Sequence, residues 1–149
     1  MLKNDAVLGG EGSSAGAIIP PSRCRDGILT AACIISLAAN EGKKLDKIIG
    51  AMPKYSTLKA KKQFEQKSYN KLINNIEIYY SNKNYKIRSL NDSIKAIVDK
   101  DSLVWFRASK TESGVFRIIT DSNNREKSEE LMKEAIEVFE NAAGTKQKR

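Results

Sequence analysis

A polar segment between two apolar runs constrains the fold of this chain more than any other feature. Residues 103–106 and 115–119 are mostly apolar and strand-like, so they predict two strands joined by a tight loop. The side chains in this region that could bind an anion are Arg107, Ser109, Lys110, Thr111 and Arg117. Arginine binds phosphate through a planar fork, lysine adds a point charge, and a turn can gather hydroxyls and backbone N–H groups in one place.

Two interpretations of this segment are open. Glu112 is its one carboxylate, and no residue stands in an obvious acid, base or nucleophile role. The segment therefore predicts either a loop that holds an anion or an ordinary hairpin turn whose charges are solvated.

Three short motifs resemble those of one enzyme family. Residues 107–112, RASKTE, resemble the R-[PA]-S-x-T-[ET] phosphate-binding loop of the α-D-phosphohexomutases. Residues 9–13, GGEGS, are similar to the sugar-binding loop of that family, and residues 24–27, CRDG, stand before an alanine-rich helix as in its prokaryotic branch. The order of the two loops and their spacing of nearly a hundred residues also fit the family. Its members are phosphoglucomutase, phosphomannomutase and phosphoglucosamine mutase, which are isomerases of carbohydrate metabolism.

The resemblance implies a role for each matching residue of the polar loop. Arg107, Ser109 and Thr111 match positions that grip the non-reacting phosphate of the substrate. Lys110 stands where the family often has glycine or asparagine, so it either adds charge or fills the turn. Arg117 resembles an arginine on the following strand, but it is shifted by one residue relative to many members, which leaves its reach to the phosphate open.

The resemblance also implies a division of the chain. Residues 1–52 would be the C-terminal remnant of the third, sugar-binding α/β domain, in which Glu11 and Ser13 contact sugar hydroxyls. Residues 53–149 would be the C-terminal phosphate-binding domain, whose fold in the family resembles that of TATA-binding proteins.

Residue patterns by themselves predict an α+β fold for residues 53–149. They favour the order strand–helix–strand–strand–strand–helix, which is an antiparallel sheet with helices on one face. The first strand, residues 55–64, carries lysines on one side and is predicted to lie at a sheet edge. In the last helix, Asn123 and Glu126 fit a capping box, and Gly144 fits the C-terminal end.

The patterns before residue 53 predict a partial α/β segment. Short strands are expected at residues 5–8 and 17–19. A helix is expected over residues 28–40, where Asp26 can cap it. Its apolar residues on nearly every face are typical of a helix that is buried all round, and much of its covering is expected to be missing from this chain. A second helix is expected after Gly42, ended by Pro53.

The chemistry of the family is missing from this chain. The serine loop T-x-S-H-N-P, the D-x-D-x-D-R loop that holds Mg²⁺, and the G-x-D-G-D loop do not occur in it. The chain alone is therefore expected to have no catalytic residues, no metal site and no cofactor, with Mg²⁺ implied for the full-length enzyme. Its expected partners are a hexose phosphate, the missing N-terminal domains of the same enzyme, and a second copy bound through the apolar helix at residues 28–37.

Composition limits the remaining possibilities. The 149 residues carry a net charge of +8, which favours anionic partners. The absence of histidine excludes the usual zinc sites and catalytic triads within the chain. Cys24 and Cys33 do not form a disulfide framework, so a reducing cytoplasm is the expected compartment, and Cys33 is predicted to be a small core residue. The longest apolar run has twelve residues, so no membrane span is expected.

Two alternative functions are considered. A small basic α+β domain could bind nucleic acid through its sheet, given its aromatic residues and the lysines at positions 43, 44, 47, 54, 59, 61, 62 and 67. Against this, the aromatic residues stand at core-like spacing, whereas an RNA-binding platform needs exposed rings. The other alternative is a non-catalytic phosphosugar-binding module.

Overall fold

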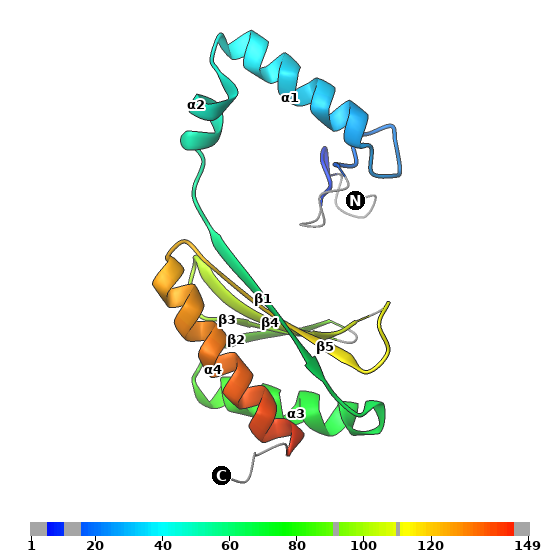
Figure 1. Cartoon of the computed structure of the whole chain (residues 1–149), viewed down its shortest axis with the longest axis vertical. Helices are drawn as coiled ribbons and strands as arrows, with labels where there is room; N and C mark the ends of the chain where they lie inside the picture. Colours follow the sequence, from blue (N-terminus) through cyan, green and yellow to red (C-terminus); the bar gives the residue numbers. More distant parts are fainter. Residues whose placement is uncertain (1–5, 11–15, 91–92, 110, 145–149) are drawn as a thin grey trace. The chain divides into compact units, whose positions relative to one another are not determined.

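The chain consists of two compact units, Met1–Met52 and Pro53–Arg149 (Figure 1). The computed structural model describes residues 6–10, 16–90, 93–109 and 111–144. No helix in the described ranges is long and apolar enough to span a membrane.

The first unit is built around one long helix, α1, which spans Gly27–Glu41. As predicted, Asp26 caps it, because its carboxylate accepts a hydrogen bond of 2.8 Å from the backbone N–H of Leu29. Gly42 ends the helix in the left-handed conformation, with φ at +62°. A short helix, α2, follows at Leu45–Gly50.

The predicted strands of this unit are only partly seen. Residues 6–8 pair with nothing among the described residues, and residues 1–5 lie outside them. Gly9 and Ile18 form one isolated bridge, and Ala17 and Asp26 form another. Ladder pairing needs a continuous neighbouring strand, and the described part of this unit contains none.

The apolar side chains of α1 are largely exposed. Ile28 is 86% exposed and Ile35 is 70% exposed. The prediction that Cys33 is a core residue is wrong, because its side chain is exposed. Within the described part of this unit no layer covers α1, so an apolar sequence does not by itself create a core.

The second unit is a five-stranded antiparallel sheet in the order β1-β5-β4-β3-β2. Its strands are β1 (Ser56–Gln63), β2 (Lys86–Leu90), β3 (Ser93–Ile97), β4 (Ser102–Ala108) and β5 (Val115–Ser122). The helices α3 (Tyr69–Asn82) and α4 (Arg125–Ala143) lie on the same face of this sheet, and a short 3-10 helix, η2, spans Gln66–Ser68 (Figure 1). The predicted α+β class and the edge position of the first strand are confirmed.

Alternation along the strands creates the core between this sheet and its two helices. In β4, Val104 and Phe106 are buried, whereas Trp105 between them is not. The fully buried side chains with the largest volumes are Tyr80, Phe106, Phe116, Phe139, Leu72, Ile76, Ile94 and Ile118. The opposite, open face of the sheet therefore carries the alternate residues, which include most of the basic ones.

Two details of the prediction for this unit are wrong, the number of strands between the helices and the residue that caps α4. Four strands, not three, separate the two helices, because residues 86–90 and 93–97 pair with each other as a hairpin. The cap of α4 is Asn124 rather than Asn123: the Asn124 side chain accepts from Lys127 N at 3.0 Å. Strand β5 continues to Ser122, and the Asn123 side chain instead donates to Asp101 at 3.1 Å.

The cap gives a first prediction. Asn124→Ala should lower the free energy of unfolding by about 1 kcal/mol, because it leaves a backbone donor of the first helical turn unsatisfied. Asn123→Ala, which removes a solvent-exposed contact, should cost clearly less. Urea unfolding followed by circular dichroism measures both, and equal losses would contradict the assignment of the cap.

The turn between β3 and β4 gives a prediction about pH. The pKa of Asp99 is lowered from 3.8 to about 2, first by the hydrogen bond from the Lys127 side chain and then by the backbone N–H of Asp101. Because the pKa of Asp99 is depressed in the folded state, its ionised carboxylate stabilises the folded state above pH 3.8. This contribution is lost as the pH falls through 2. A carbon-13 titration of the Asp99 carboxyl should show a midpoint near 2 in the wild type. In Lys127→Met it should return toward 3.8, and an unchanged midpoint would refute the pairing.

Candidate functional site

The predicted polar loop joins two neighbouring strands inside the sheet. It connects β4 to β5, and the N–H of Ser109 donates to the carbonyl of Val115 at 2.8 Å. Gly114 has a φ of +70°, which favours glycine, and its carbonyl accepts from Phe64 N at 2.9 Å. The loop is thus fastened both to its own hairpin and to the chain that leaves β1.

Strand register brings three cationic residues into one row on the open face. Arg107 on β4 stands directly opposite Arg117 on β5. Arg117 in turn stands directly opposite Lys61 on β1. Their chain neighbours Phe106 and Phe116 are buried against the helices, so the three cationic residues belong to the other face.

Glu112 in the loop bridges two of these cations. Its carboxylate accepts from Arg117 Nη2 at 2.7 Å and from Lys61 Nζ at 2.8 and 3.0 Å. The hydrogen bond from Lys61, followed by that from Arg117, lowers the pKa of Glu112 below its ordinary value. The carboxylate therefore stays ionised at neutral pH and offsets part of the positive charge.

The two hydroxyls of the loop lie close together. Ser109 Oγ and Thr111 Oγ1 are 3.4 Å apart, and the Ser109 hydroxyl also accepts from the backbone N–H of Glu112 at 3.2 Å. These short contacts hold the loop in a tight turn. Both hydroxyls are consequently held in the loop that connects Arg107 to Arg117.

Arg107 is oriented by an aromatic ring instead of a carboxylate. Its guanidinium carbon lies 5.0 Å from the centre of the Trp105 ring, and Lys95 Nζ lies 4.9 Å from the same centre. Such cation–π contacts fix the guanidinium plane while leaving its N–H groups available. In the described part of the chain, Arg107 Nε is buried without a hydrogen-bond partner, and so is Arg117 Nε.

The structure thus brings together four of the residues predicted from the polar loop: Arg107, Ser109, Thr111 and Arg117. Lys110, Glu11 and Ser13 lie outside the described residues. Sequence reasoning missed Lys61 and Trp105 as members of this region. In the sequence Lys61 is one lysine among several, and no local pattern reveals that it stands opposite Arg117 across a strand pair.

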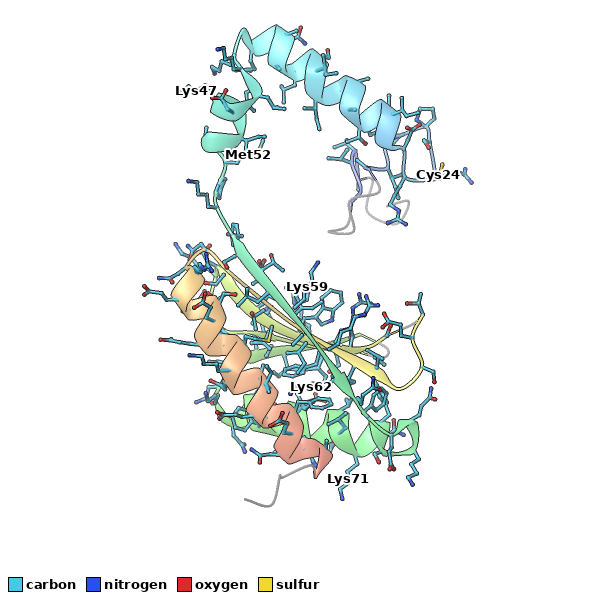
Figure 2. All side chains as sticks on the ribbon, in the orientation of Figure 1. Cys24, Lys47, Met52, Lys59, Lys62 and Lys71 are labelled. Carbon is cyan, nitrogen blue, oxygen red and sulfur yellow. The ribbon has the colours of Figure 1, made fainter. Side chains whose placement is uncertain are left out.

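The nucleic-acid alternative is not favoured by the arrangement of aromatic rings and lysines. Of the aromatic residues in the five strands, Trp105 alone lies on the open face, while Phe106 and Phe116 are in the core. Figure 2 shows Lys59 and Lys62 on opposite sides of β1, and Lys62 Nζ bonds Glu140 at 2.6 Å next to α4. The lysines therefore do not form one stripe.

The described residues offer no arrangement for a metal ion. Within residues 6–10, 16–90, 93–109 and 111–144, no group of three or more histidine, cysteine, aspartate or glutamate side chains could hold one. What the loop region can do is bind an anion: two guanidiniums and an ammonium stand in a row, and the loop between the two arginines carries two hydroxyls.

Comparison with known proteins adds an independent finding. Residues 1–55 match the family description phosphoglucomutase/phosphomannomutase, alpha/beta/alpha domain III. The chain is 34% identical over 143 residues to a phosphoglucomutase/phosphomannomutase of Thermococcus kodakarensis, covering 95% of this chain and 30% of that protein.

Two further relatives carry a related name. A phosphoglucosamine mutase of Carboxydothermus hydrogenoformans is 27% identical over 145 residues, covering 94% of this chain and 29% of the relative. A probable phosphoglucosamine mutase of Pyrococcus furiosus is 31% identical over 136 residues, covering 91% of this chain and 29% of the relative. The chain therefore spans somewhat under a third of the length of the relatives it matches.

Proposed function

Because this chain belongs to the phosphohexomutase family, we propose that its loop between β4 and β5 binds the phosphate group of a hexose phosphate. The observation that carries the proposal is the direct pairing of Arg107 with Arg117 on the open face of the sheet. Two guanidiniums on adjacent strands can share the oxygens of one phosphate, and each charge-assisted hydrogen bond to such an anion is a strong one.

The loop residues divide this task. Arg107, held against Trp105, presents donors that no carboxylate among the described residues occupies. Arg117 supplies the second fork, the hydroxyls of Ser109 and Thr111 supply uncharged donors, and Lys110 adds charge. None of these groups stands in an obvious acid, base or nucleophile role, and the family's serine and metal loops do not occur in this chain, so the site positions a substrate and leaves the chemistry to other parts of the enzyme.

We also propose an assignment for the two units. Residues 1–52 are the closing portion of the third domain, in which Glu11 and Ser13 contact sugar hydroxyls, and residues 53–149 are the phosphate-binding domain. The match of residues 1–55 to domain III and the division of the chain after Met52 support this assignment. The exposed apolar side of α1 would then be covered by the rest of the third domain or, in this chain alone, by a second copy.

Mg²⁺ is implied for the whole enzyme, but the described residues of this chain do not fit it. The ion prefers several oxygen ligands in near-octahedral geometry, and no cluster of carboxylates offers them here. The metal-binding loop and the serine that carries the phosphoryl group would belong to the other domains of the same enzyme.

The phosphate site gives a prediction for Arg107. Inorganic phosphate should bind this chain with a Kd on the order of 1 mM or weaker, since one loop holds only one part of the ligand. Arg107→Ala should weaken binding roughly tenfold or more, because it removes charge-assisted hydrogen bonds. The Kd is measured by titrating phosphate and following backbone amide NMR shifts.

Arg88→Ala is the matched control for that experiment. Arg88 lies on β2, faces Lys95 across the β2–β3 pair and is exposed. The Arg88→Ala substitution removes the same charge from the open face of the sheet, on a strand that does not adjoin the loop. If both variants weaken binding equally, phosphate is held by general charge and the proposed site is wrong.

The missing loops give a prediction about activity. The purified chain should not interconvert hexose phosphates, even with Mg²⁺ and a hexose bisphosphate, because it has no serine loop and no metal loop. A coupled assay with an active phosphoglucomutase as positive control measures this. Turnover above a protein-free control would contradict the proposal that this chain only positions substrate.

A further inference from the structure

Glu112 occupies half of the proposed anion site with its own negative charge. Its two carboxylate oxygens already receive Arg117 and Lys61, at 2.7 to 3.0 Å. An oxyanion held by an arginine and a lysine is the arrangement that a phosphate would need at this place. The carboxylate therefore marks where a bound anion can sit beside Arg117.

The position of Lys61 explains why such an internal anion is present. Lys61 and Arg117 stand directly opposite each other across β1 and β5. Like charges in direct cross-strand positions destabilise a sheet, and a carboxylate between them offsets that repulsion. The pair thus creates a place where an anion is favoured, and the Glu112 carboxylate occupies it.

We propose that Glu112 is an internal competitor for this place, and that an incoming phosphate displaces its carboxylate and takes over both Arg117 and Lys61. The inference rests on the proposed function and deepens it, because it adds Lys61 to the phosphate contacts and assigns Glu112 the role of a displaceable counter-ion. Lys61 comes from the edge strand β1 and is 51 residues away in the sequence from Glu112 of the loop.

Two features allow the exchange. The Glu112 side chain is 38% exposed and Lys61 is 63% exposed, so the bridge forms in a well-solvated position, where ion pairs contribute little. The backbone of Glu112 is fastened separately, through its N–H to Ser109 Oγ, so the carboxylate can turn away while the loop keeps its shape. A phosphate dianion carries more charge and more acceptor oxygens than the carboxylate it replaces.

The test compares phosphate affinity in Glu112→Gln and in the wild-type chain, by amide NMR titration. Removing the competitor should tighten binding roughly two- to fivefold, which is the range expected from losing an exposed ion pair. Glu129→Gln is the matched control. Glu129 accepts from Arg125 at 3.0 Å on α4, so this substitution removes the same charge from an ion pair outside the loop. In an Arg117→Met background the gain from Glu112→Gln should shrink.

A second measurement uses the wild-type chain and does not depend on how a variant folds. The carbon-13 resonance of the Glu112 side-chain carboxyl should move as phosphate is added, while that of Glu129 should stay in place. Binding that is unchanged or weaker in Glu112→Gln, or a Glu112 resonance that does not move, would overturn the inference. Weaker binding would make Glu112 a residue that positions Arg117.

The outcomes separate this inference from the proposed function. If Arg107→Ala weakens phosphate binding and Glu112→Gln does not tighten it, only the competitor role is wrong. If neither change affects binding, the loop is not the phosphate site and the proposed function fails with it.

Discussion

The register of three antiparallel strands determines the anion site proposed for this protein. Pairing of β1, β5 and β4 places Lys61, Arg117 and Arg107 in one row. A shift of one residue between β4 and β5 would turn an arginine toward the helices and an aromatic side chain toward the solvent, and the same shift of β1 would turn Lys61 inward. The burial of Phe106 and Phe116 under α3 and α4 therefore holds the arginines on the open face, and the core fixes the binding site.

That arrangement concentrates positive charge, and the structure accommodates it in two ways. Glu112 neutralises part of the charge on Arg117 and Lys61. Trp105 accommodates Arg107 and Lys95 on its ring without neutralising either. The two arginines consequently differ: one is paired with a carboxylate and the other is stacked, with its donors available. This difference is the physical basis for expecting Arg107 to dominate phosphate affinity.

Much of this could be predicted from the sequence, because the signals were local. The family was recognised from two short loops and is supported by the comparisons, and Asp26 was identified as a cap from its position before an apolar helix. What failed depended on distant parts of the chain. Cys33 is exposed because burial requires a covering layer, which sequence periodicity cannot supply.

The remaining errors have the same origin. Asn124 caps α4 because β5 extends to Ser122, and Asn123 instead bonds Asp101, a contact between segments that are 22 residues apart. Lys61 could not be assigned to the site because it is 51 residues from Glu112 in the sequence. The two residues come together only because β1 pairs with β5. A motif identifies the residues within one loop, whereas the partners of that loop depend on the register of the sheet.

A crystal structure of this chain grown in inorganic phosphate would test the central claim most directly. We expect a phosphate whose oxygens lie within hydrogen-bond distance of the guanidiniums of Arg107 and Arg117, with the Glu112 carboxylate turned away from Lys61. Phosphate bound only at exposed lysines elsewhere, with Glu112 still bridging Arg117 and Lys61, would contradict it.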